Sequence, residues 1–403
     1  MKISFLMGRG IEGCGVTKFT LEQNDWFNRN GHTSTIFAPK DKNWTRKTSH
    51  EVAGVVCTKW AKDEEADKVI AACNESDFII ITSLPSVGHP EGCISNFKKI
   101  LASLDKPVVF IQLDHKMMSI KRNAALDEAI DASDVMFSLS RYNDFCKYVK
   151  QRQGGAFGAL EGIKQTQIFA YQVGFRFDEN KAIFWKDIKE QDVKHHKWIG
   201  RTTSWKGYDQ MFKFHNNFLR GNGCLTTFEG IEKSPAFLGF KDLSEFIECV
   251  GQDPETYDLS NGYGNLAHVF GPYNNEQLLH RLSKCGFGYQ LSLLDQPYIE
   301  NALEYTHCEI VATGVIPVFR AGWGRRAKHR VTQVPLIDCK DTGTIWLDDD
   351  DMAPALEQIK MLEKDEGMRE EWRNMAFEFY REHQDAEHIF VDMWNKMKSY
   401  VGA

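Results

Sequence analysis

The chain has 403 residues, enough for two or three domains at about 150 residues each. Its composition, 42% hydrophobic and 26% charged, excludes disordered, collagen-like and coiled-coil proteins. The formal net charge of −7 excludes a uniformly basic nucleic-acid coat, so any contact with phosphates needs local basic patches. Apolar runs stay below the ~18 residues that cross a bilayer, and no secretory signal is recognisable, so no membrane association is expected.

The ten cysteines include no Cys-x-x-Cys pair and no close histidine at zinc spacing. Scattered cysteines in a chain of this length predict reduced core thiols in a cytosolic protein. No metal site is expected from them.

The pattern up to about residue 175 predicts one open α/β sheet. A short apolar strand, residues 2–7, runs into the glycine-rich loop Gly8–Gly15, and a helix follows over residues 16–30. Gly31 caps that helix before a strand at 33–37, which completes a βαβ unit with ligands expected at the carboxyl ends of its strands. The remaining elements predicted here are strands at 77–82, 107–112 and 134–138 and a helix at 96–104.

A charged segment with little periodicity, residues 178–195, is predicted to connect this domain to a second α/β domain. The predicted elements of the second domain are strands at 197–200, 224–228, 316–320 and 344–347, helices at 208–219 and 300–313, and a helical region from residue 351. The expected domains are therefore 1–178 and 190–379, with the C-terminal helix 380–403 as a candidate to complete the first.

Two loops carry groups suited to a diphosphate. Glycines in Gly8–Gly15 let the backbone approach phosphates, and the helix after them offers free N–H groups, although a tight turn needs the same glycines. No acidic residue ends the next strand, which disfavours NAD. Arg201 and Lys206 lie on one loop, where the planar guanidinium group of the first and the ammonium group of the second suit a diphosphate. The alternative is a solvated cationic loop.

Two carboxylates are candidates for binding hydroxyl groups. The segment Glu304–Val318 is interpreted as a carboxylate at a helix N-terminus followed by glycine and a strand, with Glu309 the candidate for both hydroxyls of a ribose. Its alternative is a solvated helix glutamate. Asp114 follows the strand that ends at Gln112 and is placed to hold an acceptor hydroxyl or a sugar, the alternative being an N-cap or a surface turn.

These elements, in this order, resemble the two-domain GT-B glycosyltransferases that use nucleotide sugars, and more narrowly the DNA α-glucosyltransferases of T-even bacteriophages. The resemblance implies an α/β fold of the GT-B class, with two Rossmann-like domains facing across a cleft and a helical C-terminal tail. The matching segments span nearly the whole chain and are GRGIEGCGVTKFTLEQNDWF, NGHTSTIF, WIGRTTSWKGYDQMFKFH, EGIEKSPAF, KCGFGYQLSLL, LEYTHCEIVATGVIPVF and FYREHQD.

The same resemblance implies a reaction. A sugar is expected to pass from a UDP-sugar, with retention, to the hydroxymethyl group of 5-hydroxymethylcytosine in double-stranded DNA. Such a modification protects phage DNA from host nucleases in the cytoplasm of the infected bacterium. The enzyme is expected to be a monomer and to need no metal for catalysis.

By resemblance, Gly13, Gly15 and Val16 present backbone N–H groups to the donor diphosphate. Arg201 and Lys206 balance the charge that develops on the leaving UDP.

Glu309 is expected to hold the ribose, and the run containing Gly288 and Tyr289 to form a loop near the donor, a plain turn being the alternative. Asp114 and His115 are the candidate catalytic residues at the acceptor. No second carboxylate stands out as a covalent nucleophile, which favours front-face displacement.

Leu113 departs from the family pattern, because the strand end that reads Gln-His-Asp-His in T-even glucosyltransferases reads Gln112-Leu113-Asp114-His115 here. Leucine cannot hydrogen-bond the exocyclic hydroxymethyl group of a hexose. The donor therefore stays open between UDP-glucose and a UDP-pentose such as UDP-arabinose, with simple packing of Leu113 as the alternative.

Basic clusters are predicted to bind the DNA phosphates together, although a single such cluster is more often a solvated face. The first surrounds a tryptophan suited to stack or wedge beside an extruded base. The candidate residues are Lys42, Trp44, Arg46, Lys47, Lys121, Arg122, Arg325 and Arg326.

Two other functions compete with this interpretation. A GT-B enzyme for a lipid or oligosaccharide acceptor would keep the donor motifs and show a membrane-binding stripe, which the first domain lacks. A nucleotide- or nucleic-acid-binding protein with a decayed site is disfavoured by the joint presence of the glycine loop, Arg201, Lys206 and Glu309.

Overall fold

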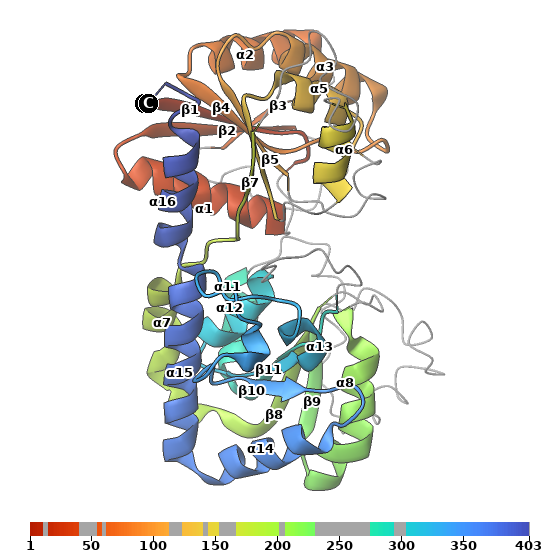
Figure 1. Ribbon diagram of the computed structural model, residues 1–403, viewed down its shortest axis with the longest axis vertical. Helices are drawn as coiled ribbons and strands as arrows, with labels where there is room; N and C mark the ends of the chain where they lie inside the picture. Colours follow the sequence, from red (N-terminus) through yellow and green to blue (C-terminus); the bar gives the residue numbers. More distant parts are fainter. Residues whose placement is uncertain are drawn as a thin grey trace. The chain divides into compact units, whose positions relative to one another are not determined.

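The computed structural model describes residues 1–10, 15–39, 55–58, 62–112, 123–139, 144–152, 167–200, 206–229, 275–293 and 304–402. The chain divides into two compact units, each built on its own sheet (Figure 1). The first comprises Met1–Gly174 with Ala386–Ala403, and the second comprises Phe175–Asp385. The sequence analysis expected the first domain to end at residue 178 and its C-terminal helix to begin at residue 380, whereas the units divide after Gly174 and after Asp385.

The N-terminal unit holds a seven-stranded parallel sheet in the order β3-β2-β1-β4-β5-β6-β7. Its strands are β1 (Lys2–Met7), β2 (Thr33–Pro39), β3 (Val55–Thr58), β4 (Phe78–Ser83), β5 (Val108–Gln112), β6 (Val135–Ser138) and β7 (Gln167–Ala170). Strands β4, β5 and β6 are buried along their whole length, which explains their continuous apolar runs. The short edge strands β3 and β7 lack such runs and were not predicted.

Helices cover this sheet and include one from the far end of the chain. They are α1 (Gly15–Arg29), α2 (Asp63–Asn74), α3 (Glu91–Ala102), α5 (Leu126–Ala132), α6 (Asp144–Arg152) and α16 (Ala386–Met397). Phe390 of α16 packs edge-on against Phe19 of α1, with ring centroids 5.6 Å apart. Trp26 donates from Nε1 to the Glu387 carboxylate over 2.7 Å. Helix α16 therefore belongs to the core of the N-terminal unit.

The C-terminal unit holds a five-stranded parallel sheet in the order β12-β11-β10-β8-β9. Its strands are β8 (Asp192–Ile199), β9 (Leu225–Glu229), β10 (Cys285–Gln290), β11 (Ile316–Arg320) and β12 (Ile345–Leu347). Its helices are α7 (Phe177–Phe184), α8 (Tyr208–Phe214), α11 (Asn275–Ser283), α12 (Tyr305–Ala312), α13 (Ala321–Gly324), α14 (Ala353–Lys364) and α15 (Glu366–Gln384). Within the described ranges, every helix is too short or too polar to span a bilayer.

Two predictions about this unit are wrong. The expected connection at 178–195 forms α7, a 3-10 helix over Trp185–Glu190 and the start of β8, because its few aromatic residues are anchored in the unit. Trp185, for example, donates from Nε1 to the Ala312 carbonyl over 3.0 Å.

The glycine-rich run expected to be a loop is the buried strand β10. A Cβ atom on Gly288 would lie 2.8 Å from Ile310 Cγ2, so glycine is needed there for the close approach of α12 to the sheet.

Candidate functional site

Each sheet has one switch point, the pair of neighbouring strands from which the strand order runs outward in opposite directions. Ligands of open α/β sheets bind beyond the carboxyl ends of the strands at this point. The order of strands places it between β1 and β4 in the N-terminal unit and between β8 and β10 in the C-terminal unit. Each switch point is therefore a candidate ligand site of its own unit.

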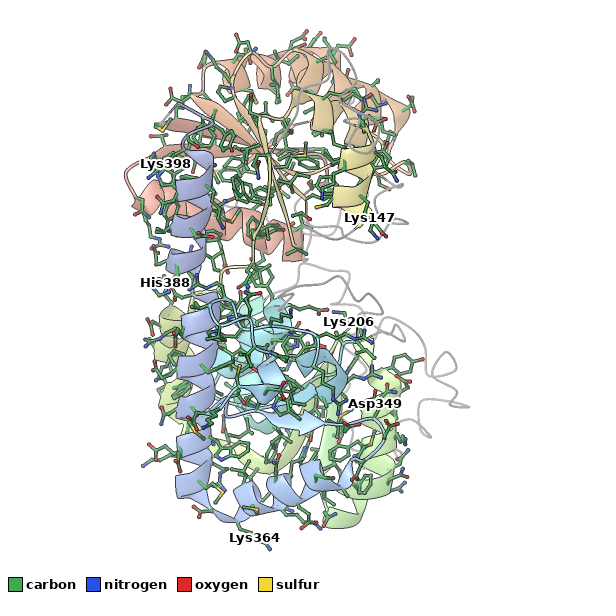
Figure 2. All side chains as sticks on the ribbon, viewed as in Figure 1. Lys147, Lys206, Asp349, Lys364, His388 and Lys398 are labelled. Atoms are coloured by element: carbon green, nitrogen blue, oxygen red, sulfur yellow. The ribbon has the colours of Figure 1, made fainter. Side chains whose placement is uncertain are left out.

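A buried ion pair occupies the switch point of the C-terminal unit. Lys206 follows the carboxyl end of β8, and its ammonium group is bonded to the Glu304 carboxylate (Figure 2 labels Lys206). The exposed fractions of the two side chains are 11% and 22%. Gln290, the last residue of β10, donates from Nε2 to the same carboxylate over 3.0 Å. The Gln290 Oε1 atom accepts two hydrogen bonds from Ser292, one from the backbone N–H over 3.0 Å and one from the hydroxyl over 2.7 Å. This chain of bonds fixes the position of the Lys206 ammonium group.

Glu304 also caps helix α12. Its backbone N–H donates to Nδ1 of the buried His307 over 3.1 Å, and the His307 ring stacks on Trp323 at 4.1 Å. Burial lowers the pKa of His307 to about 3, so the ring is neutral and Nδ1 acts as an acceptor. Burial raises the pKa of the Glu304 carboxyl, but the charge and hydrogen bond of Lys206, together with smaller contributions from its other neighbours, outweigh burial and leave that pKa below its ordinary value. The site therefore holds a lysine cation against a glutamate anion at neutral pH.

Gly207 determines where Lys206 can lie. Its φ is +70°, and a Cβ atom there would lie 2.3 Å from the Leu291 carbonyl oxygen. Only glycine fits both the left-handed backbone and the passage against the chain that leaves β10.

Glu309 is not the carboxylate at the helix N-terminus, and this part of the expectation is wrong. Helix α12 begins at Tyr305, so its capping carboxylate is Glu304, while Glu309 lies inside the helix and is 5% exposed. Glu304 and Gln290 were missed by the sequence analysis. The available signal for Glu304 was its spacing from His307, because a carboxylate and a hydrogen-bond acceptor three residues apart can form a capping box at the start of a helix.

Three arginines lie near the carboxyl ends of strands β11 and β12. Arg320, the last residue of β11, donates from Nε to both Asp349 oxygens over 2.9 and 2.8 Å, and Asp349 follows β12 (Figure 2). Arg325, just after α13, pairs with Asp348 and has a side chain 57% exposed. Arg326 beside it is also exposed. The two arginines expected to bind DNA, Arg325 and Arg326, are thus surface residues of the C-terminal unit.

At the switch point of the N-terminal unit, β1 and β4 are joined through the start of the glycine loop. The Gly8 N–H donates to the Ser83 carbonyl over 2.8 Å, and the Arg9 N–H donates to the Ser83 hydroxyl over 3.2 Å. Gly15 and Val16 open helix α1, so both lie where expected, at a helix N-terminus beyond this strand end.

Other expected site residues are either in the core or outside the described residues. Tyr289 is fully buried, and its hydroxyl shares a hydrogen bond of 2.6 Å with His196 Nδ1, so its side chain faces the core and not a donor loop. Outside the described residues lie Gly13, Lys42, Trp44, Arg46, Lys47, Leu113, Asp114, His115, Lys121, Arg122 and Arg201.

Known proteins share both the sequence and the fold. The sequence model of the family described as "DNA alpha-glucosyltransferase" matches residues 14–367. The DNA alpha-glucosyltransferase of Enterobacteria phage T4 is 39% identical over 404 residues, which cover 98% of this chain and 99% of the relative. A structure of an alpha-glucosyltransferase with UDP-glucose and abasic-site DNA is 36% identical, covers 99% of both chains and has a TM-score of 0.84. HepE of Anabaena in complex with UDP shares only the fold, at 11% identity and a TM-score of 0.57, with 99% and 100% of the chains covered.

These similarities confirm the expected GT-B class, with two Rossmann-like domains and a helical C-terminal region. They also confirm the resemblance drawn from the sequence motifs, since the family match and the phage relative both extend across most of the chain. The chain belongs to the DNA alpha-glucosyltransferase family.

Proposed function

We propose that this protein transfers a sugar from a UDP-sugar, with retention, to the hydroxymethyl group of 5-hydroxymethylcytosine in double-stranded DNA. The observation that carries the proposal is the Lys206–Glu304–Gln290 network at the switch point of the C-terminal sheet. Family membership supports it, as do solved relatives in complex with UDP-glucose and DNA, or with UDP and DNA containing an HMU base. The product would protect phage DNA in the cytoplasm of the infected bacterium.

In this proposal the donor diphosphate binds to the basic loop and to the glycine-rich loop. Lys206 and Arg201 balance the negative charge on the leaving UDP, and no metal is needed for that step. An ammonium group already fixed by Glu304 needs no reorganisation as the charge develops. Backbone N–H groups at Gly13, Gly15 and Val16 bind the diphosphate, and Glu309 holds the ribose.

On the acceptor side, Asp114 and His115 hold the hydroxymethyl group for front-face displacement, and the protein acts as a monomer. The DNA is bound through cationic side chains, with Trp44 beside the extruded base. The cationic residues are Lys42, Arg46, Lys47, Lys121, Arg122, Arg325 and Arg326.

The donor sugar is assigned through Leu113. An apolar wall at this position leaves the exocyclic hydroxyl of a buried glucose without a partner, at a cost of about 1 to 3 kcal/mol. A pentose such as arabinopyranose has no such group, so UDP-arabinose is expected to outcompete UDP-glucose.

The test incubates hydroxymethylated DNA with a panel of UDP-sugars, identifies the released nucleosides by mass and reads their anomeric configuration by NMR. We expect an adduct on hydroxymethylcytosine with the same anomeric configuration as the sugar of the donor, and none on unmodified DNA. Absence of an adduct with every donor would overturn the proposed reaction. Leu113→His should shift the preference toward UDP-glucose, whereas a clear wild-type preference for UDP-glucose would exclude Leu113 as the selecting residue.

A further inference from the structure

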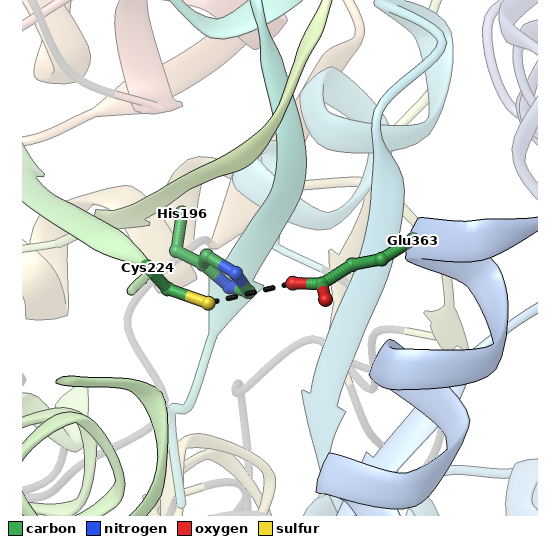
Figure 3. A group of neighbouring side chains, drawn as sticks. All are labelled: His196, Cys224 and Glu363. Carbon is green, nitrogen blue, oxygen red and sulfur yellow. Dashed lines mark hydrogen bonds between the residues drawn. The ribbon is translucent and has the colours of Figure 1, made fainter. Parts of the chain in front are cut away.

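A second group of polar side chains lies in the C-terminal unit, separate from the Lys206 site. His196 of β8, Cys224 directly before β9 and Glu363 of α14 each offer one ligand atom, and the three atoms lie within 4.8 Å of one another (Figure 3). Cys224 stands at the amino end of its strand, whereas Lys206 follows the carboxyl end of β8. The group is therefore not part of the proposed donor site.

The group is buried, and two of its three ligand atoms already have the spacing of a coordination site. His196 is 0% exposed, Cys224 is 5% exposed, and the Glu363 side chain is 7% exposed. The Cys224 thiol donates from Sγ to Glu363 Oε1 over 3.4 Å, the hydrogen bond dashed in Figure 3. A tetrahedral zinc ion with bonds of about 2.3 Å to sulfur and about 2.0 Å to oxygen separates two such ligands by about 3.5 Å. These two atoms can share one ion without rearrangement.

His196 supplies an independent sign of a missing partner. Its Nδ1 is bonded to the Tyr289 hydroxyl over 2.6 Å, while its Nε2 is buried with no partner among the described residues. Buried polar atoms are nearly always hydrogen-bonded, so this ring nitrogen is available to bind an ion. Holding one ring nitrogen by a hydrogen bond while the other binds the ion is the usual arrangement of a metal-ligating histidine.

The remaining carboxylate oxygen is also oriented. Lys194 donates from Nζ to Glu363 Oε2 over 2.6 Å, which leaves Oε1 facing Cys224. A thiolate and a carboxylate together neutralise a divalent cation, while the Lys194 side chain, 44% exposed, keeps its own charge at the surface. One sulfur, one nitrogen and one oxygen favour zinc over the oxygen-binding ions calcium and magnesium.

We propose that His196, Cys224 and Glu363 bind one zinc ion that ties strands β8 and β9 to helix α14. On binding, the Cys224 thiol loses its proton to solvent as the sulfur–zinc bond forms. The ion is structural and takes no part in sugar transfer, so this inference does not depend on the proposed function.

The test uses the full-length protein, stripped with a chelator and then titrated with Zn²⁺ or Co²⁺. We expect one equivalent to bind, a thiolate-to-cobalt charge-transfer absorption to appear, and the melting temperature to rise with Zn²⁺. Cys224→Ser should abolish the charge-transfer absorption, and Glu363→Gln should weaken Zn²⁺ binding by at least about 10- to 100-fold, the loss seen when only the outer partners of metal ligands are replaced. Cys73→Ser, which removes a buried thiol of the N-terminal unit, is the matched control and should bind like the wild type.

Absence of stoichiometric binding and of the charge-transfer absorption in the wild type would overturn the proposal. So would binding by Cys224→Ser as tight as that of the wild type, which would mean an adventitious surface ion. If Cys224→Ser does not fold, the wild-type cobalt spectrum and the affinity of Glu363→Gln decide between the two outcomes.

Discussion

The ammonium group of Lys206 and the carboxylate of Glu304, 98 residues apart in the sequence, form an ion pair that is mostly shielded from solvent at the switch point of the C-terminal sheet. Removing one partner leaves the other charge buried and unpaired, which costs more than the pair itself contributes. The two residues therefore have to be tested together.

Lys206→Ala should lower the free energy of unfolding by about 3 to 5 kcal/mol, because it leaves the Glu304 carboxylate uncompensated. It should also reduce sugar transfer by about 10²- to 10³-fold, because the variant no longer stabilises the leaving group. Adding Glu304→Gln should restore much of the stability and none of the rate, as measured by urea unfolding and steady-state transfer.

Lys360→Ala is the control for this pair, because Lys360 belongs to an exposed helix pair with Glu357. Equal stability loss in Lys206→Ala and in the double variant would show that the two charges are not coupled.

Gly207→Ala should be more destabilising than Gly223→Ala, although both glycines have nearly the same positive φ, 70° and 69°. At Gly223 nothing lies within 4 Å of the added methyl, so only the backbone cost of about 1 to 2 kcal/mol applies. At Gly207 the methyl meets the Leu291 carbonyl, which adds about 1 to 3 kcal/mol of overpacking. Urea unfolding of the two variants compares them, and equal losses would contradict the close approach at Gly207.

Acid should destabilise the C-terminal unit from about pH 6.5 downward. Burial lowers the pKa values of His307 and His383 to about 3, so between pH 6.5 and about 3 the unfolded state binds protons that the folded state excludes. The free energy of unfolding therefore keeps its full value above the unfolded-state pKa of about 6.5. As the pH falls below that value, it decreases by up to about 1.4 kcal/mol per pH unit for each histidine.

His383→Asn should flatten this dependence, because asparagine can still accept the Arg330 N–H bonded to His383 Nδ1 at 2.9 Å but cannot titrate. Urea unfolding between pH 4 and pH 7 measures how the free energy of unfolding changes with pH, and the expected slope corresponds to on the order of one proton per histidine. The exposed His388, changed to Asn, serves as the control. A slope that His383→Asn leaves unchanged would rule out His383 as a source of the acid sensitivity.

Replacing Arg325 and Arg326 together by Ala should weaken DNA binding and reduce the slope of log affinity against log salt by about 0.9 for each phosphate that the variant no longer neutralises. Asp348→Asn should strengthen binding at low salt, because it removes the acidic partner of Arg325. Arg152→Ala, which breaks an ion pair with Asp131 on the N-terminal unit, is the control. The proposed DNA contact fails if the salt slope of the double variant equals that of the wild type.

Local patterns determined much of this fold from the sequence alone. Strands Phe78–Ser83 and Val108–Gln112 are recognisable because parallel strands buried on both faces need unbroken apolar runs. The loop containing Lys206 is recognisable because a cationic segment between a strand and a helix carries its own signal. Long matching segments identified the family, since they preserve many such local signals at once.

Tertiary structure decided what depends on residues far apart in the chain. Gly288 lies in a loop-like sequence but in a buried strand, because the contact of Ile310 with the sheet exists only after folding. Glu304 is the partner of Lys206, and the Cys224 thiol is bonded to Glu363, which lies 139 residues further along the chain. Both pairs form because folding around the sheet brings distant segments of the chain together. Such pairings have no period or spacing in the sequence, so only the packed sheet shows them.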